Sequence, residues 1–258
     1  GRGAFIGKLH DDTRGQAFCR DIKALGVSFK TPPATDGLPT ATSLVLISPD
    51  AERTMQTYLG ASTELNPNDI DEGEISAAAV TYLEGYLWDP PAAKEAFIKA
   101  ADIAHAKRRI VSLSLSDPFC VERHRADFLD LVSNHVDILF ANEEEIISLY
   151  KADDFGTALA AVQQHCKIAA LTRGANGSVV SAAGELFMVD SEPIERLVDT
   201  TGAGDAYAAG FLFGLSQGND LARCARIGSI IAAEVVQHLG ARSDRSLKNL
   251  IASKLDRS

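Results

Sequence analysis

Residues 199–211 read Asp-Thr-Thr-Gly-Ala-Gly-Asp-Ala-Tyr-Ala-Ala-Gly-Phe, and they form the most informative stretch of the chain. A polar, glycine-rich turn runs directly into a segment of small residues that is typical of a packed helix. Glycines allow backbone N–H groups to approach a ligand closely, and a helix N-terminus carries partial positive charge. The stretch therefore predicts a backbone cradle for an anion such as phosphate.

Asp205 has two interpretations in this cradle. A fixed carboxylate repels phosphate, so an aspartate at this place needs a function that outweighs the repulsion. It has one if it accepts the proton of a hydroxyl group that attacks the phosphorus. Alternatively, Asp205 stabilises the helix dipole from the first turn, and Gly202 and Gly204 serve only the turn. The spacing excludes a Rossmann motif, because Tyr207 stands where G-x-G-x-x-G needs its third glycine, and the chain has no G-x-x-x-x-G-K-[ST].

Short apolar runs alternate with helical periodicity in the sequence that precedes this cradle. The predicted strands cover residues 78–83, 109–115, 136–140 and 168–172. The predicted helices cover residues 92–105, 120–134 and 154–165, followed downstream by 204–217, 221–238 and 245–255. Alternation of this kind is typical of βαβ units, so we expect an α/β fold with a mainly parallel central sheet flanked by helices.

Two segments depart from the alternation and read as β-hairpins. Residues 40–59 form two extended arms around Ser48-Pro49-Asp50, which has the composition of a turn. Residues 177–189 form a second hairpin that turns near Ala183-Gly184. We expect a single domain over residues 1–258, with the first hairpin as a small β lid near residues 39–62.

Composition excludes several classes of protein. The 258 residues carry 25 Lys and Arg against 35 Asp and Glu, a formal net charge of −10. This balance disfavours binding to nucleic acid or to an anionic membrane, because both need a positive field. No apolar run approaches the ~18 residues of a membrane span. The four cysteines are scattered singly, which favours reduced thiols in a cytoplasmic protein over disulfides or a zinc site.

Residues 199–205 match the signature D-T-x-G-A-G-D in full, and the chain thereby resembles the ribokinase family of PfkB-type carbohydrate and nucleoside kinases. The resemblance covers nearly the whole chain and implies a ribokinase-like fold. It implies that Asp205 is the catalytic base of phosphoryl transfer from ATP. It also implies that the backbone amides of Gly202, Ala203 and Gly204 form an anion hole for the transferring phosphoryl group.

Asn142 and Glu145 follow the predicted strand 136–140 and match the family's N-x-x-E motif. Ligands of open α/β sheets bind beyond the carboxyl ends of the strands. The resemblance implies that this pair holds the Mg²⁺ ion of the nucleotide through water. Without the resemblance, Asn142 reads as a helix N-cap followed by acids in the first turn, and both interpretations can hold together.

The segment from Thr172 to Gly177 ends the next predicted strand and resembles the family's T-x-G-x-x-G nucleotide segment. The resemblance implies ATP contacts for Thr172, Arg173, Gly174 and Gly177. A turn from strand to hairpin would explain both glycines equally well. Arg173 either reaches a phosphate or lies in solvent.

Two further matches lie at the C-terminal end of the predicted helix 221–238. The resemblance places His238 and Gly240 beside the adenine of ATP, whereas helix physics explains Gly240 as a C′ residue and His238 as a dipole partner. Asp199 and the carbonyl group of Thr201 match positions that hold a monovalent cation, for which K⁺ is the candidate.

Residues 51–61 and 81–90 look like the adenosine-kinase-like branch of the family. This likeness implies a small-molecule substrate, a purine nucleoside phosphorylated on its 5′-hydroxyl, with adenosine as the first choice. Arg53 would position the transferred phosphate when the lid closes, unless it is a solvated hairpin arginine. Tyr58 and Tyr86 are candidates to contact the purine, although ordinary packing would also explain them.

Two other functions stay open, a sugar kinase for ribose, fructose or a keto-deoxy sugar acid, and a family member that binds nucleotide without turnover. The apolar strand 43–47 could pair between subunits of a homodimer or merely cover the site.

The chain begins at Gly1, close to a predicted strand at residues 3–7. Family members carry some tens of residues before this point, so we expect that upstream sequence with part of the substrate site is missing.

Overall fold

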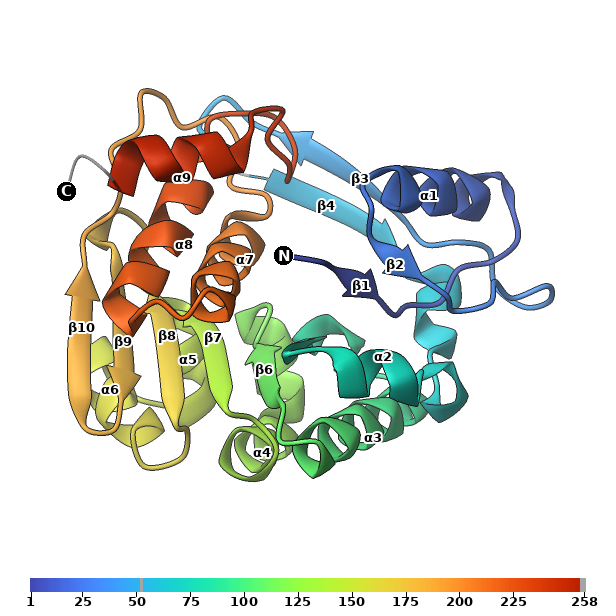
Figure 1. Ribbon diagram of the computed structural model, residues 1–258, viewed down its shortest axis with the longest axis horizontal. Helices are drawn as coiled ribbons and strands as arrows, with labels where there is room; N and C mark the ends of the chain where they lie inside the picture. The colour runs from blue at the N-terminus through green and yellow to red at the C-terminus, as the bar shows by residue number, and fades with distance from the viewer. Residues whose placement is uncertain (52, 256–258) are drawn as a thin grey trace.

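The computed structural model describes residues 1–51 and 53–255, and a six-stranded sheet lies at its centre (Figure 1). The strands are β5 (Val80–Glu84), β6 (Ile110–Ser114), β7 (Ile138–Asn142), β8 (Ile168–Thr172), β9 (Ser178–Ala182) and β10 (Glu185–Val189). Their order across the sheet is β10-β9-β8-β7-β6-β5. Strands β5 to β8 run parallel, and β9 is antiparallel to both neighbours. The predicted mainly parallel sheet is therefore confirmed.

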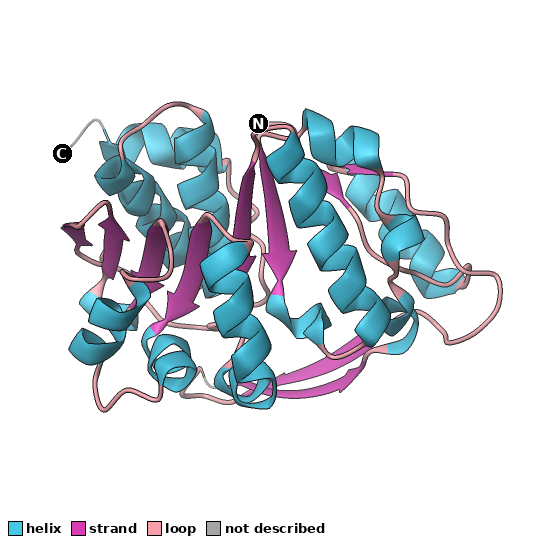
Figure 2. Cartoon of the chain, turned by 90° about the horizontal axis from the view of Figure 1, so that it is seen from below, coloured by secondary structure: helices cyan, strands magenta, loops and turns pink. Residues whose placement is uncertain are grey.

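Helices cover both faces of this sheet (Figure 2). One face carries α7 (Ala203–Ser216) and α8 (Leu221–Val235), with α9 (Leu247–Leu255) packed on α8. The other face carries α3 (Pro91–Ala106), α4 (Pro118–Asn134), α5 (Glu143–Tyr150) and α6 (Phe155–Val162).

Alternate side chains of the central strand β7 supply both cores. Ile138 and Phe140 pack in the core that contains Phe211 of α7, whereas Leu139 packs with Phe128 of α4 in the opposite core. Burial on both faces explains why the parallel strands read as continuous apolar runs.

Helices α7 and α8 approach each other at backbone distance. A Cβ atom on Gly210 would lie 2.8 Å from the Cα atom of Gly228, and one on Gly228 would lie 2.8 Å from the carbonyl oxygen of Tyr207. The buried Tyr207 hydroxyl bonds Ser178 Oγ of β9 at 2.9 Å. The N-terminal half of α7 is therefore held firmly against both the sheet and α8.

A small N-terminal unit lies beside the main sheet (Figure 1). Strands β1 (Ala4–Phe5) and β2 (Ser28–Phe29) pair in parallel around α1 (Thr13–Ala24). Asp12 caps α1 by accepting the Gly15 amide at 2.8 Å, and its other oxygen accepts the Thr40 amide at 2.9 Å. These hydrogen bonds hold the pKa of Asp12 at about 2. Helix α2 (Glu72–Ala77) and the 3₁₀ turns η1 (Gly60–Glu64), η2 (Pro67–Asp69), η3 (Gly85–Trp88) and η4 (Gly174–Asn176) complete the fold.

The first predicted hairpin consists of β3 (Thr42–Ile47) and β4 (Arg53–Tyr58), which form a two-stranded antiparallel sheet of their own. In the register of this hairpin Ile47 lies directly opposite Arg53. Directly opposed residues of an antiparallel pair project from the same face. One face carries Arg53, Val45 and Met55. The opposite face carries the exposed apolar side chains of Leu44, Leu46 and Tyr58. The second hairpin is β9–β10, as predicted.

The end of helix α8 differs from the prediction. The helix stops at Val235, so His238 and Gly240 lie beyond it, and Gly240 is not its C′ residue. The physical reason is that the Val236 carbonyl accepts the amides of Val198 and Asp199 at 2.9 and 3.3 Å, which turns the chain away from the helix axis.

All four cysteines are free thiols, as predicted from their spacing. No helix within residues 1–51 and 53–255 combines the length and the apolar character that crossing a membrane requires.

Candidate active site

The predicted anion cradle lies at the N-terminus of α7, where Gly202 is the N-cap residue. Gly202 has a φ of 77°, and a Cβ atom on it would lie 2.5 Å from Ala241 Cβ. Both observations require glycine at this position. A Cβ atom on Gly204 would instead meet no atom within 4 Å, so open space faces this residue at the helix end.

The amides of the cradle are not equivalent. The Ala203 amide donates to the Thr200 carbonyl oxygen at 3.2 Å, and this bond closes the turn. Within the described parts of the chain, the amides of Gly202, Gly204 and Asp205 have no hydrogen-bond acceptor. First-turn amides without acceptors are suited to an anion. The structure thus favours Gly202, Gly204 and Asp205 over Ala203 as amide donors, and sequence reasoning missed the Asp205 amide.

Asp205 lies in the first turn of α7, directly after Gly204, and it is exposed. Desolvation by the surrounding protein raises the pKa of Asp205, and the positive charge of Arg53 opposes this effect. A raised pKa makes this carboxylate a better proton acceptor than an ordinary surface aspartate.

Arg53 of β4 reaches across to the cradle. Its Nη1 atom donates to Thr200 Oγ1 at 2.6 Å, although the two residues are 147 positions apart in the sequence. The charge of Arg53 also helps to lower the pKa of Asp199. The structure therefore brings the exposed side chain of Arg53 to the cradle, and its contact with a transferred phosphate stays a prediction.

Asp199 connects the cradle to the loop that follows α8. Its carboxylate is 1% exposed and accepts the Thr201 amide and the Gly240 amide, each at 2.8 Å. Burial would raise the pKa of Asp199, but these hydrogen bonds outweigh burial and lower it. The Thr201 hydroxyl also helps to lower the pKa of Asp199, so it lies beside this carboxylate. A buried carboxylate and a neighbouring hydroxyl offer oxygen ligands that suit a cation such as K⁺.

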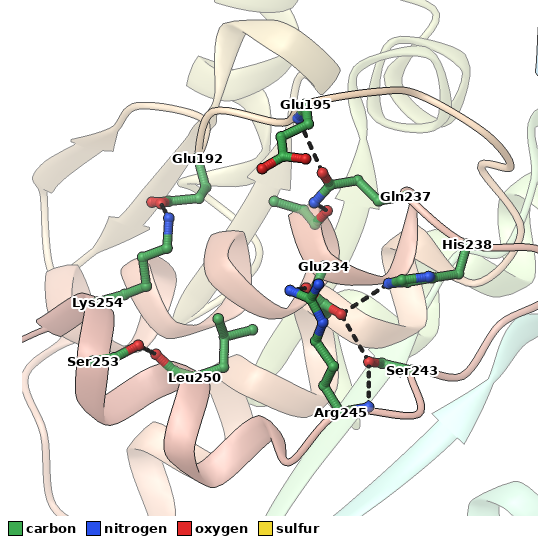
Figure 3. Close-up of polar contacts among 11 residues, drawn as sticks. Glu192, Glu195, Glu234, Gln237, His238, Ser243, Arg245, Leu250, Ser253 and Lys254 are labelled. Carbon is green, nitrogen blue, oxygen red and sulfur yellow. Dashed lines mark hydrogen bonds and ion pairs between the residues drawn. The ribbon is translucent and has the colours of Figure 1, made fainter.

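Glu234, near the end of α8, fixes the loop that carries Gly240 (Figure 3). Its buried carboxylate bonds His238 Nε2 at 2.9 Å, Ser243 Oγ at 3.0 Å and Arg245 Nη1 at 3.4 Å. Burial would raise the pKa of Glu234, but its three partners outweigh burial and lower it. The imidazole of His238, predicted to contact adenine, thus has an internal partner.

Asn142 and Glu145 form a capping box at the start of α5. Asn142 donates its amide and its side chain to Glu145 at 2.9 and 2.7 Å, and Glu145 returns its own amide to Asn142 Oδ1 at 2.8 Å. Burial raises the pKa of Glu145 to about 7. The helix-capping interpretation is confirmed, and each carboxylate oxygen keeps a lone pair for water.

Within residues 1–51 and 53–255, no group of three or more His, Cys, Asp or Glu side chains is arranged to hold a metal ion. A cation at this edge of the sheet would therefore have few protein ligands. Mg²⁺ on a nucleotide is usually held in this way, mainly by phosphates and water. The donor set of Asn142 and Glu145 fits such an ion through water.

Arg173, predicted to reach a phosphate or to lie in solvent, has protein partners in the structure. Its guanidinium forms a bidentate contact with Glu143 at 3.0 and 3.1 Å, and lies 4.3 Å over the ring of Phe155. Thr172 pairs with Asn142 in the sheet, so the predicted nucleotide segment and the capping box are neighbours.

The two glycines of the Thr172–Gly177 segment both have positive φ. Gly177 has a φ of 77°, and a Cβ atom on it would clash with the Val189 carbonyl oxygen. Gly174 has a φ of 56°, and a Cβ atom on it would meet no atom within 4 Å. The turn alone therefore requires glycine at Gly177.

Glu84 is a further candidate for the site that the sequence did not reveal. It ends β5, and its half-buried carboxylate accepts the hydroxyls of Ser116 and, at 3.2 Å, Tyr82. Burial raises the pKa of Glu84 to about 7, and the negative charge of Asp205 also raises it. The signal in the sequence was its place at the carboxyl end of a predicted parallel strand.

The two candidate tyrosines are placed differently. Tyr86 lies at the same edge as Glu84, where its amide donates to Ser116 Oγ at 3.1 Å. Burial and the negative charges of Asp117 and Glu84 raise its pKa. Tyr58 lies on the face of the β3–β4 hairpin opposite to Arg53, so the register does not bring it to the cradle.

Comparisons with known proteins agree with this arrangement. The pfkB family of carbohydrate kinases matches residues 1–248. The structure of an adenosine kinase from Sinorhizobium meliloti is 45% identical, with a TM-score of 0.95, and the match covers 100% of this chain and 78% of that one. The structure of a probable sugar kinase from Rhizobium etli CFN 42 is 46% identical, with a TM-score of 0.96 and the same coverage.

An uncharacterized sugar kinase from Archaeoglobus fulgidus is 26% identical over 246 residues, which are 93% of each chain. The fold is thus the ribokinase-like α/β fold, with a central mixed sheet flanked by helices. The chain belongs to the pfkB family of carbohydrate kinases, and it is an ATP-dependent phosphotransferase that acts on a hydroxyl acceptor.

Proposed function

We propose that the chain, acting as one kinase domain, phosphorylates the 5′-hydroxyl of a purine nucleoside, with adenosine as the substrate. The carrying observation is that Asp205, whose pKa is raised, stands among amides without acceptors, while Arg53 reaches the same cradle. Identity of 45% to an adenosine kinase supports a nucleoside as the acceptor.

Asp205 takes the proton of the attacking hydroxyl, whose oxygen forms a bond to the γ-phosphorus as the bond to ADP breaks. The amides of Gly202, Gly204 and Asp205 then stabilise the charge on the transferring phosphoryl group. Electrostatic stabilisation of this kind is usually the largest catalytic contribution. Mg²⁺, when bound, offsets phosphate charge, and Asn142 and Glu145 would hold it through water.

Glu84 is placed to bind the acceptor. It lies close enough to Asp205 for the two charges to interact, at the edge of the sheet where ligands bind. The hydroxyls of Ser116 and Tyr82 fix the Glu84 carboxyl group, which can accept hydrogen bonds from substrate hydroxyls.

The β3–β4 hairpin acts as a lid in this proposal. The face that carries Arg53 also carries Met55 and Val45, which would cover the acceptor and exclude water.

The outer face of the lid, with Leu44, Leu46 and Tyr58 exposed, supports pairing with a second copy. Sedimentation of the wild type and Leu46→Lys tests this pairing. A dimer that Leu46→Lys dissociates supports it, and a wild-type monomer refutes it.

A panel of acceptors with ATP, followed by ADP release, tests the function. We expect fast turnover of adenosine, and at least a ~10²-fold lower kcat for Asp205→Asn, because general base catalysis contributes at least that much. Near-normal turnover in Asp205→Asn would remove this residue from the mechanism.

A sugar kinase is the second candidate, favoured by the 46% identity to a probable sugar kinase. Turnover of ribose, fructose or a keto-deoxy sugar acid without turnover of adenosine would select it. Calorimetric binding of ATP without transfer to any acceptor would instead identify a non-catalytic nucleotide-binding protein.

A further inference from the structure

We propose that Thr200 is a positioning residue for phosphoryl transfer, because its hydroxyl holds the guanidinium of Arg53 over the anion cradle. The inference rests on the proposed kinase function and assigns a role to a side chain of the 199–205 signature that the sequence analysis left without one. The carrying observation is the 2.6 Å bond from Arg53 Nη1 to Thr200 Oγ1.

Arg53 depends on this bond for its position. It projects from an exposed strand of a two-stranded hairpin, and within residues 1–51 and 53–255 its guanidinium has no other hydrogen bond and no ion pair within 4.0 Å. A long, unpacked arginine samples many rotamers, and ordering it lowers the free energy gained from phosphate binding. Thr200 fixes one nitrogen before the nucleotide arrives.

Thr200 also shapes the cradle itself. Its carbonyl oxygen accepts the Ala203 amide at 3.2 Å, and this bond closes the turn before α7. One residue therefore sets the turn with its backbone and the arginine with its side chain. Together these two bonds of Thr200 set the distance between the guanidinium of Arg53 and the amides of Gly204 and Asp205.

An uncharged hydroxyl group suits the position beside the Arg53 guanidinium better than a carboxylate would. Asp199 and Asp205 both attract Arg53, as the effect of Arg53 on their pKa values shows. A direct ion pair with Asp205 would occupy the proposed base. A guanidinium has five N–H donors, so one bond to Thr200 leaves the others for phosphate oxygens.

Thr200→Val and Thr200→Ser test the role, because valine keeps the shape of threonine without the hydroxyl and serine keeps the hydroxyl. We expect kcat to fall about tenfold in Thr200→Val, the loss of roughly one hydrogen bond to a charged group. The KM for the acceptor should change less than about twofold, since Arg53 faces phosphate. Thr200→Ser should restore kcat to within about threefold of the wild type.

A double-mutant cycle with Arg53→Met identifies the partner. If Thr200 acts through Arg53, the double variant Arg53→Met/Thr200→Val should lose no more activity than Arg53→Met alone. Multiplicative losses, or a Thr200→Ser variant as slow as Thr200→Val, would overturn the proposal.

Thr54→Val is the matched control. Thr54 follows Arg53 on β4 and, opposite Leu46, lies on the other face of the hairpin. We expect an unchanged kcat. An equal loss in Thr54→Val would mean that general weakening of the hairpin, and not the position of Arg53, lowers the rate, and it would refute the role of Thr200.

Calorimetric titration with ATP separates this inference from the proposed function. Thr200→Val and Arg53→Met should each weaken ATP binding severalfold, and together no more than Arg53→Met alone. One outcome is that the wild type transfers phosphate to no acceptor while the two substitutions still have non-additive effects on ATP binding. In that case the proposed function fails and the positioning role stands. If the wild type turns over and the effects on ATP binding are independent, the positioning role fails alone.

Discussion

Replacing Glu84 by glutamine should stabilise the protein in a manner that depends on pH. Burial raises the pKa of Glu84 from 4.5 to about 7. Each pKa unit corresponds to about 1.4 kcal/mol, so the ionised carboxylate costs the folded state up to roughly 3 kcal/mol. The carboxyl group is half-buried, and solvent screening reduces this cost to about 2 kcal/mol. Glutamine has the same shape, carries no charge, and can still bond Ser116 and Tyr82.

The sign follows from proton binding. Between pH 4.5 and 7 the folded protein holds the Glu84 proton more tightly than the unfolded chain, so this group makes stability fall as pH rises. Below pH 4.5 both states are protonated and the cost disappears. Above pH 7 both states are ionised and the cost is complete. The advantage of Glu84→Gln over the wild type should therefore be about 2 kcal/mol larger at about pH 8 than at about pH 5.

Urea unfolding followed by circular dichroism at the two pH values measures this difference without any ligand. Glu122→Gln is the control, because it removes the same charge from an exposed position on α4. Its effect should be the same at both pH values. An advantage of Glu84→Gln that does not grow with pH would refute the reasoning, because burial of the carboxylate would then carry no free-energy cost.

Three further variants test the cradle and its support. Gly204→Ala should leave the free energy of unfolding within about 0.5 kcal/mol, because its Cβ meets no atom, yet kcat/KM should fall at least about tenfold as the methyl group enters the phosphate site. Gly202→Ala should lower the free energy of unfolding by about 2 kcal/mol, because residue 202 has a φ of 77° and an added Cβ would lie 2.5 Å from Ala241 Cβ. Glu234→Ala should cost about 2 kcal/mol in thermal unfolding and release the loop that carries Gly240, so that limited proteolysis cuts this loop faster than in the wild type; equal cleavage rates would contradict its role.

The sequence predicted the parts of the site that depend on local chain geometry. A glycine-rich turn before a small-residue helix forms a cradle whatever surrounds it, and Asp205 lies in that cradle as expected. The parallel strands of the main sheet and both hairpins were likewise located, because their periodicity is local, whereas β2 was missed. Helix α1 was missed because Arg20, Asp21 and Lys23 mask its weak apolar face, and it begins at the Asp12 cap.

Long-range contacts decided what the sequence could not predict. Glu84 becomes a site residue only because Ser116 and Asp205 approach it from other elements. Arg173 contacts Glu143 of α5 and Phe155 of α6, and no local sequence pattern predicts these contacts. The end of α8 was misplaced because apolar residues continue past Val235, whereas the backbone pairing of Val236 with residues 198 and 199 stops the helix.

Local unfolding should separate the β3–β4 hairpin from the rest of the molecule. Its strands bond to each other, are open to solvent on most positions, and lack the double-sided cover of β7. Amide hydrogens in residues 42–58 should therefore exchange with deuterium by low-energy opening, while those of β7 exchange only on global unfolding. The protein would thus behave as two cooperative units, in which the site can admit and release molecules at little free-energy cost while the core stays intact.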